Sequence, residues 1–275
     1  SRVIDGCISR FSLESTDGGY AHYSATLVPW LWHLSRRQDS RIFQEQTVEE
    51  IVRAVLSGYG ALPQFEFRLF HPLKTHSYVT QYFETDLNFV LRLLEAEGLF
   101  FFFEHSEQGH CMVVADHSPH LLALPAQPRI RYHTASVTEA ADAITHWSAH
   151  REFQPGSIAV QTFDYKQPDN PLVVSMSNLN DQGETSSYEM YDQTQAYSHR
   201  DYDDGNALLR RRIELLELKS KLFKGAGHCR SMLPGYTFEL LQHFDHDRGA
   251  TKDRQFLLLR VEHQGRNNYL SSHPA

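Results

Sequence analysis

The stretch that most constrains the fold runs from Tyr78 to Glu104, where the apolar pattern changes from alternating to helical and back. The alternation at its start predicts a strand. A helix is expected to begin near Thr85 or Asp86 and to end at Gly98, because glycine readily adopts the left-handed backbone that terminates many helices. The predicted buried stripe of this helix consists of four apolar residues at helical spacing: Leu87, Val90, Leu91 and Leu94.

The run from Leu99 to Phe103 follows the helix and consists of five apolar residues. It is too short for a second helix and rich in aromatic side chains, so it predicts a buried strand. The same phenylalanines would suit the lining of a ligand cavity, but the stretch offers neither a nucleophile nor a metal cage. We therefore expect a strand-helix-strand unit whose apolar side chains form a core.

The overall composition excludes several kinds of protein. The 275 residues carry a net charge of -8. A general nucleic-acid-binding domain usually has a basic excess to meet phosphates, so no nucleic-acid partner is expected. No apolar run approaches the roughly 18 residues of a membrane helix, and the first residues lack the pattern of a signal peptide. Because the chain opens in a strand-like pattern without an initiator methionine, we expect it to be part of a longer product.

Most of the other predicted elements are strands. Residues 7–14 and 20–28 flank Asp17, Gly18 and Gly19, a sequence suited to the positive backbone angles of a tight turn, and so predict a β-hairpin. Further strands are predicted from short apolar or alternating runs: 111–115, 144–153, 157–165, 235–241 and 255–262.

Two more helices are predicted. The first covers residues 48–57 and begins at a capping box, in which Thr47 and Glu50 satisfy each other's backbone amides. The second is the longest of the chain, at residues 206–223. Several prolines interrupt residues 116–130, which predicts a connection between two modules.

A metal or acid-base site must be considered because the chain contains 17 histidines. In the densest polar cluster an extended segment would present His243, Asp245 and Asp247 on one side, with His246 between them. A polar loop between two strands explains the same residues, and their spacing matches no metal-binding template. Two other histidine pairs flank turns: His105 with His110, and His117 with His120.

No motif for nucleophilic catalysis or phosphate binding is present. The sequence has no GxSxG elbow and no phosphate-binding glycine loop. The three cysteines are too far apart for a disulfide framework or a metal knuckle, and a reducing compartment of synthesis is expected: Cys7, Cys111 and Cys229. His228 and Cys229 are adjacent, so on a strand they would point to opposite faces. We predict no catalytic, cofactor-binding or metal site, and no cofactor.

Two groups of surface residues suit a binding role. Arg36 and Arg37 would suit a phosphate or a partner's carboxylate, but a solvated loop is the simpler interpretation of these residues and the one we favour. Trp30 and Trp32 would form the platform of a carbohydrate-binding β module. These residues favour a binding or structural protein over an enzyme.

Four segments of the sequence, 27–52, 78–104, 163–172 and 227–240, resemble the VgrG-type spike proteins of type VI secretion systems, which are similar to the hub of contractile phage tails. The strings are LVPWLWHLSRRQDSRIFQEQTVEEIV, YVTQYFETDLNFVLRLLEAEGLFFFFE, FDYKQPDNPL and GHCRSMLPGYTFEL. They occur in the order expected for this family and together span nearly the whole chain.

The resemblance implies a mainly β fold with α+β insertions, built from two related β-barrel domains of the phage tail hub type. Family members begin earlier, with strands that complete the first barrel, and continue into an oligonucleotide-binding-like domain and a β-helical needle. The first barrel is therefore expected to be incomplete at its N-terminus. The implied division is 1–40 and 116–140 for the first barrel, 41–115 for an inserted α+β subdomain, 141–268 for the second barrel with one long helix, and 269–275 for a tail.

The resemblance also implies a function. Three chains with two barrels each would form six similar units in a ring, which adapts a three-fold spike to a six-fold tube. Such a hub helps to puncture target membranes and deliver effectors. The implied partners are two further copies of the chain, the hexameric tube protein and baseplate components. A spike-tip protein, and effectors or their adaptors, would bind mainly through the absent C-terminal region.

The expected location follows from this role. The protein would be made in the bacterial cytoplasm without a signal peptide, assembled in the injection machine, and secreted into the medium or the target cell. Some family members carry a C-terminal effector enzyme, so the expectation that the protein is not an enzyme concerns this segment alone. Alternative readings are a tail hub protein of a contractile-tailed phage or prophage, and a metal-dependent cell-wall hydrolase.

Overall fold

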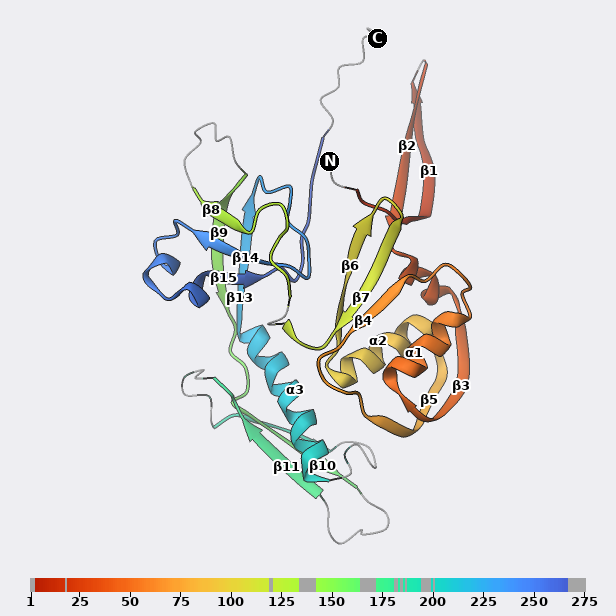
Figure 1. Cartoon of the computed structure of the whole chain (residues 1–275), viewed down its shortest axis with the longest axis vertical. Helices are drawn as coiled ribbons and strands as arrows, with labels where there is room; N and C mark the ends of the chain where they lie inside the picture. The colour runs from red at the N-terminus through yellow and green to blue at the C-terminus, as the bar shows by residue number, and fades with distance from the viewer. Residues whose placement is uncertain are drawn as a thin grey trace.

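The computed structural model describes most of the chain, in ten segments: 3–17, 19–118, 121–133, 142–163, 172–180, 183, 185, 187–193, 199 and 201–266. The described residues form five small sheets and three α-helices, so the fold is mostly β, as predicted. Figure 1 shows a projecting hairpin, a compact α/β unit and a longer arm that contains the remaining sheets.

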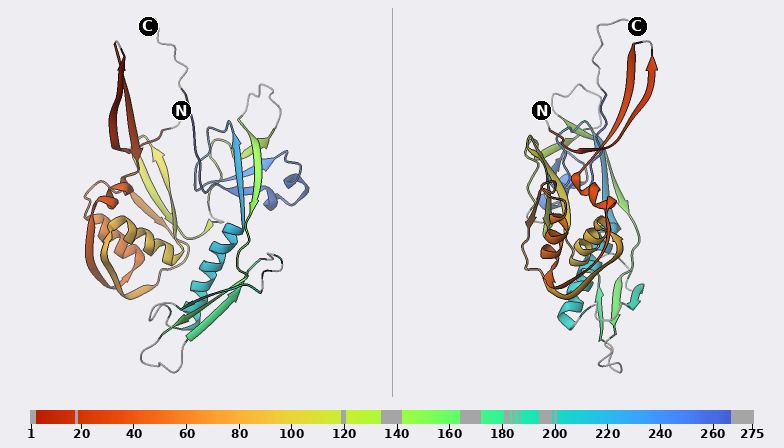
Figure 2. Two further views of the ribbon diagram at one scale, coloured as in Figure 1. Left: turned by 180° about the vertical axis from the view of Figure 1, so that it is seen from behind. Right: turned by 90° about the vertical axis from the view of Figure 1, so that its right-hand side faces the viewer.

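The hairpin consists of β1 (Cys7–Asp17) and β2 (Tyr20–Val28), which pair only with each other among the described strands. The predicted hairpin is therefore confirmed. The two further views in Figure 2 show that it extends away from the rest of the molecule.

The α/β unit contains two sheets and two helices. Its elements are η1 (Trp30–Arg36), β3 (Gln38–Thr47), α1 (Val48–Ser57), β4 (Phe65–Arg68), β5 (Thr75–Thr85), α2 (Asp86–Glu97), β6 (Phe100–Ser106) and β7 (Gly109–Ala115). Strands β3 and β5 form an antiparallel pair, and β7 lies between β4 and β6. The strand-helix-strand unit is confirmed as β5, α2 and β6.

Helix α2 begins and ends where the sequence predicts. Its N-cap Thr85 accepts a hydrogen bond from the backbone N–H of Asn88, and Gly98 closes the helix with a φ of 71°. The predicted buried stripe is only half correct, because Leu87 and Leu91 are partly exposed. Phe89 and Leu93 are buried in their place, since α2 packs against η1 and α1 as well as β5 and so buries a wider face.

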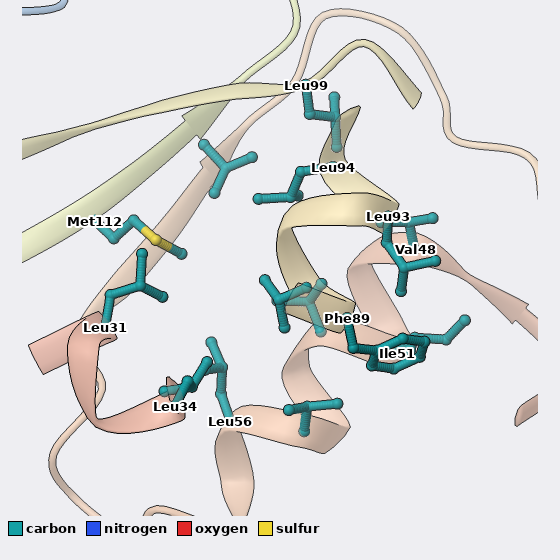
Figure 3. Close-up of a cluster of buried hydrophobic side chains, with 14 of the residues drawn as sticks. Leu31, Leu34, Val48, Ile51, Leu56, Phe89, Leu93, Leu94, Leu99 and Met112 are labelled. Atoms are coloured by element: carbon teal, nitrogen blue, oxygen red, sulfur yellow. The ribbon is translucent and has the colours of Figure 1, made fainter. Parts of the chain in front are cut away.

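The core of this unit joins residues that lie far apart in the sequence (Figure 3). Side chains from η1, both helices and β7 meet there: Leu31, Leu34, Val48, Ile51, Leu56, Phe89, Leu94 and Met112. The capping box that begins α1 is present, because Thr47 accepts from the Glu50 backbone N–H while the Glu50 carboxylate accepts from the Thr47 backbone N–H. The helix predicted at 48–57 is confirmed, because α1 begins and ends at the same residues.

The arm contains a five-stranded sheet in the order β13-β9-β8-β14-β15. These strands are β8 (Arg129–Tyr132), β9 (Ala143–Arg151), β13 (Lys221–Gly227), β14 (Thr237–Leu241) and β15 (Gln255–Leu257). The sheet curls into a half-barrel, and the rings of Phe223 on β13 and Phe256 on β15 lie 5.0 Å apart although these are its two edge strands. Strand β8 lies in the range 116–140, which was expected to belong to the first barrel. It pairs with β9 and β14, which lie in the range expected for the second barrel, 141–268.

A three-stranded sheet is inserted between β9 and β13. It has the order β11-β10-β12, formed by β10 (Ser157–Thr162), β11 (Leu172–Ser177) and β12 (Glu189–Gln193). Helix α3 (Tyr202–Ser220) covers one face through Leu209 and Ile213, which pack on Ile158, Val160 and Val174. Within the described residues, no helix is both long and apolar enough to cross a membrane.

The helix predicted at 206–223 differs from α3 at both ends. It begins earlier, because Asp201 caps it by accepting from the Asp204 backbone N–H. It ends at Ser220, and the next residues form β13, which pairs antiparallel with β9. The ladder with β9 supplies the backbone hydrogen bonds of Lys221 to Phe223 that a longer helix would otherwise make. The strand predicted at 255–262 is also shorter, since β15 ends at Leu257.

The α/β unit meets α3 through charged side chains. The Lys74 ammonium lies 2.7 Å from the Asp204 carboxylate. Glu97 lies 2.8 Å from the His76 ring and 3.6 Å from the Arg211 guanidinium. The contact between the α/β unit and helix α3 therefore consists of ion pairs at these residues.

We expect Phe89→Ala to destabilise the chain much more than Leu91→Ala. Phe89 is fully buried and stacks on Phe43 with ring centroids 5.6 Å apart, whereas Leu91 is partly exposed. Truncation of a buried phenylalanine costs ~3 to 5 kcal/mol, and the Leu91 change should cost no more than about half of that. Urea unfolding followed by circular dichroism measures both; equal losses would contradict the observed face of α2.

Candidate functional site

The cluster at His243 to Asp247 is part of a folded loop and not an extended segment. The 3-10 helix η3 (His246–Arg248) interrupts it, and His243 Nδ1 accepts a hydrogen bond from the Asp245 backbone N–H. The Asp247 carboxylate lies 3.9 Å from the Arg254 guanidinium. In the part of the chain that the structure describes, no group of three or more metal-ligating side chains is arranged to hold an ion. The His243 ring and the Asp247 carboxylate therefore make structural contacts within the loop.

A second arrangement brings a carboxylate, a histidine and a thiol together. Asp5, Cys7, Trp30 and His110 line a cavity of about 330 Å³. His110 Nδ1 lies 2.5 Å from the Asp5 carboxylate, and His110 Nε2 accepts from the Trp30 backbone N–H at 2.8 Å. Because both ring nitrogens are engaged, His110 cannot accept the proton of a nucleophile. The contacts instead fix the base of the hairpin, where the Asp5 backbone N–H also donates to His105 Nδ1 at 3.2 Å.

Two of the three thiols, Cys111 and Cys229, are not activated. Burial raises the pKa of Cys229 to about 11, with a smaller effect from the Asp142 charge. Burial also raises the pKa of Cys111. Both thiols therefore stay protonated near neutral pH, and the thiolate is the nucleophilic form. Cys229 packs in the core of the half-barrel, so the adjacent His228 and Cys229 form no catalytic pair.

The remaining histidine pair lies only partly within the described residues. The His117 ring stacks on Phe70 with centroids 5.4 Å apart and contacts the His71 ring, which lies 2.9 Å from the Asp116 carboxylate. His120 lies outside the described residues.

The predicted carbohydrate platform does not form. Trp30 is buried in the α/β core and packs edge-on against Phe103. Trp32 is partly buried, and the guanidinium of Arg36 lies 4.2 Å from its ring centroid. One indole is therefore inside the protein, and the other is covered by a cation, so neither presents a free face to a sugar ring.

Arg37 takes part in a network around a buried carboxylate of its own chain. Asp86 is fully buried and lies 2.5 Å from the Arg41 guanidinium and 3.8 Å from that of Arg37. The Tyr59 hydroxyl and the Gln81 amide each donate to Asp86 at 2.8 Å. Burial raises the pKa of Tyr59, and its hydrogen bond to Asp86 raises it further. The sequence suggested that Arg36 and Arg37 bind a phosphate or a partner's carboxylate. Arg37 does lie near a carboxylate, but this carboxylate belongs to the same chain.

The strongest candidate for a functional surface is one face of the hairpin. Strand pairing places five large apolar side chains on this face, each 55% to 62% exposed: Ile8, Phe11, Leu13, Tyr23 and Leu27. The rings of Phe11 and Tyr23 stack with centroids 5.3 Å apart. The opposite face is mainly polar, with Arg10, Ser12, Ser24 and Thr26 among its residues. We call the first set the apolar hairpin face.

The amphipathic character of the hairpin has a physical consequence. A two-stranded ribbon is at best marginally stable in water without a covered face. A large contiguous exposed apolar patch marks an interaction surface for protein, membrane or ligand. Sequence reasoning found the hairpin but not this face, because two bulges shift the register of β1, between Ile8 and Arg10 and between Leu13 and Ser15. Only β2 shows the regular alternation of apolar and polar residues that would reveal an apolar face, since Tyr23, Ala25 and Leu27 alternate with polar residues.

Comparisons with known proteins match nearly the whole chain. The family model described as phage tail baseplate hub (GPD) matches residues 1–269. The type VI secretion system spike protein VgrG1a of Pseudomonas aeruginosa strain PAO1 is 30% identical over 264 residues, which are 96% of this chain and 40% of that protein. The chain therefore spans about two fifths of this curated relative.

Two solved structures share the fold. One is the Escherichia coli c3393 protein, described as a type VI secretion component similar to the T4 phage tail proteins gp27 and gp5; its TM-score is 0.64 at 19% identity, over 93% of this chain and 55% of that chain. The other is the 43 kDa tail protein of prophage MuSo2 from Shewanella oneidensis, with a TM-score of 0.60 at 11% identity, over 91% of this chain and 72% of that chain.

We expect Asp86→Ala to be strongly destabilising, by ~3 to 5 kcal/mol, because it removes the fully buried carboxylate on which Arg41, Tyr59 and Gln81 converge and leaves the buried Gln81 amide without this partner. The matched control is Asp39→Ala. Asp39 pairs with the same two arginines but is 32% exposed, so its removal should cost at most about 1 kcal/mol. Urea unfolding at neutral pH measures both. Similar losses would show that the Asp86 network does not hold the α/β unit together.

Proposed function

This chain belongs to the phage tail baseplate hub family, and on that premise we propose that it forms the structural hub of a trimeric type VI secretion spike. The observation that carries the proposal is the similarity to a type VI spike protein over 96% of this chain. The likeness of the fold to a type VI secretion component supports the same reading. The role is mechanical, and we propose that this segment acts without catalysis.

The hub would adapt a three-fold spike to a six-fold tube. In this proposal, residues 1–40 and 116–140 belong to a first barrel, 141–268 form a second barrel, and 41–115 are inserted in the first. Three chains would place six similar barrels around one axis. The curled five-stranded sheet supports a barrel in the second part of the chain.

The proposed partners follow from the position of a hub in the machine. They are two further copies of this chain, the hexameric tube protein and the baseplate. Because the chain spans 40% of its curated relative, puncture of membranes and delivery of effectors are proposals for the longer protein, as are contacts with a spike-tip protein and with effectors or their adaptors. Such a protein would be made in the cytoplasm, assembled into the machine and secreted.

The apolar hairpin face fits this assembly. In the proposed division the hairpin belongs to the first barrel, and the inner face of a small barrel is filled with apolar side chains. The five exposed apolar residues would then lie inside the completed barrel, with the polar face outward. This arrangement removes from water the largest apolar surface on the hairpin.

A tail hub of a contractile-tailed phage or prophage is the second candidate. It is favoured by the family description and by the likeness to a prophage tail protein. The sequence downstream of this segment and the neighbouring genes separate the two, since tail and secretion operons encode different partners. A metal-dependent cell-wall hydrolase has less support, because His243 Nδ1 and the Asp247 carboxylate are engaged in contacts within the folded loop.

The first test is the solution mass of the full-length gene product, measured by light scattering, with end-on images of the particles. We expect a trimer and a ring of six similar lobes with three-fold symmetry. A strict monomer at micromolar concentration would contradict the hub proposal.

A second test concerns the apolar hairpin face. Phe11→Asp in the full-length product should destabilise the first barrel, because a buried carboxylate without a partner costs several kcal/mol, and should thereby reduce the trimeric fraction at least about tenfold. Ser24→Asp introduces the same charge on the polar face of the hairpin and should leave assembly unchanged. Sedimentation velocity compares the two variants; equal behaviour would exclude burial of this face in the assembly.

A further inference from the structure

The two edge strands of the five-stranded sheet come together through aromatic side chains. Phe223 of β13 contacts Phe256 of β15, and both rings contact Trp147 of β9, at centroid distances of 5.4 Å and 4.7 Å. β13 and β15 share no backbone ladder. Side-chain packing alone therefore holds these two edges close. We call the contact of Trp147, Phe223 and Phe256 the seam.

His246 closes the seam from the loop between β14 and β15. Its ring lies 5.3 Å from Phe223 and 5.1 Å from Phe256, so it touches both edge strands. Its Nε2 accepts a hydrogen bond from the Trp147 indole N–H at 3.1 Å. An accepting nitrogen carries no proton, so the observed contact requires the neutral ring. A proton on Nε2 would face the indole N–H and break this hydrogen bond.

The His243 ring packs against the His246 ring. Its ring is buried and lies 4.8 Å from the His246 ring and 4.7 Å from that of Tyr132 on β8. Its Nδ1 accepts from the Asp245 backbone N–H at 3.3 Å, which again requires an unprotonated nitrogen. The loop is thus held by two neighbouring histidines, each of which uses an acceptor nitrogen that protonation would remove.

Charged groups from several elements face this pair. Asp245 and Asp247 of the same loop favour protonation of His243. Asp247 and Glu239 of β14 are both paired with Arg254, at 3.9 Å and 2.7 Å. The Lys221 ammonium lies 5.5 Å from the Phe223 ring. Burial lowers the pKa of His243, and the nearby His246 lowers it further, so these effects outweigh the two aspartates.

We propose that His243 and His246 form a pH-sensitive switch that closes the seam when both rings are neutral and releases the β14–β15 loop when they are protonated. Two positive charges whose rings lie 4.8 Å apart would repel each other and would lose both acceptor contacts. Release of the loop uncovers Trp147 and separates β13 from β15. Both edges then become available for pairing with another strand. The proposal does not depend on the function proposed above.

The direction of the pH dependence follows from proton binding. The pKa of folded His243 is lower than that of the unfolded chain, so the unfolded state binds more protons between the two values. The contribution of neutral His243 to the closed seam is therefore complete above about pH 6.5, the ordinary pKa of histidine. Its stability falls as the pH drops through the lower pKa of folded His243.

Hydrogen exchange of the chain tests the switch. Protection of the β13 and β15 amides, corrected for intrinsic exchange, is compared at about pH 7.5 and about pH 5. We expect protection to fall by about tenfold for each pH unit per proton taken up by the open state. Amides of β10 and β11 are the internal control, because neither strand contacts the seam, and their protection should stay constant. Unchanged protection of β13 and β15 overturns the proposal.

Variants identify the groups that titrate. In His243→Asn the amide oxygen replaces the Nδ1 acceptor, and in His246→Gln it replaces Nε2, so the double variant keeps both acceptors and loses both titrations. Its seam should stay protected at about pH 5. His22→Gln, at an exposed site on β2, should open like the parent chain. Opening of the double variant at the same pH as the parent chain overturns the proposal.

If the double variant does not fold, a measurement on the parent chain tests the switch instead. The ring protons of His243 and His246 are followed by NMR as the pH falls. Protonation that coincides with loss of protection in β13 and β15 supports the switch. Protonation of both rings while those amides stay protected overturns it.

Discussion

The structure depends on one constraint, which is that a sheet of two or three strands must have a covered face to be stable in water. The sheets of the α/β unit share the core formed with α1 and α2, and the three-stranded sheet is covered by α3. The five-stranded sheet covers itself by curling, so that its edge strands meet at the seam. Among the sheets of the described residues, the hairpin alone leaves its apolar face open, which is why it is the strongest candidate for burial in a larger assembly.

Titratable side chains serve the same structural purpose. Asp86 is fully buried and contacts two arginines, a tyrosine and an amide in the α/β unit, so loss of these contacts would leave its carboxylate without compensation. His110 fixes the base of the hairpin, and His243 and His246 close the seam. Groups that would serve catalysis in an enzyme are thus occupied by contacts within the chain.

The hub proposal connects these observations. Membership of the phage tail baseplate hub family supplies the expected ring, and the hairpin supplies an apolar surface suited to a completed barrel. The proposed switch at the seam would make the surface of the half-barrel depend on pH, since the closed and the opened half-barrel present different strand edges. The apolar hairpin face and the seam lie in different parts of the chain and are tested by different experiments. If one of the two proposals is wrong, the other is unaffected.

The sequence by itself determined the elements whose signals are local. The capping box at Thr47, the end of α2 at Gly98 and the turn of the hairpin depend on neighbouring residues alone. Four sequence strings also indicated the family. Tertiary structure decided the rest: the buried face of α2, the end of α3 at Ser220, the burial of Trp30 and the seam. These features depend on contacts between residues far apart in the chain, and a local pattern carries no information about which distant strand or helix will cover it.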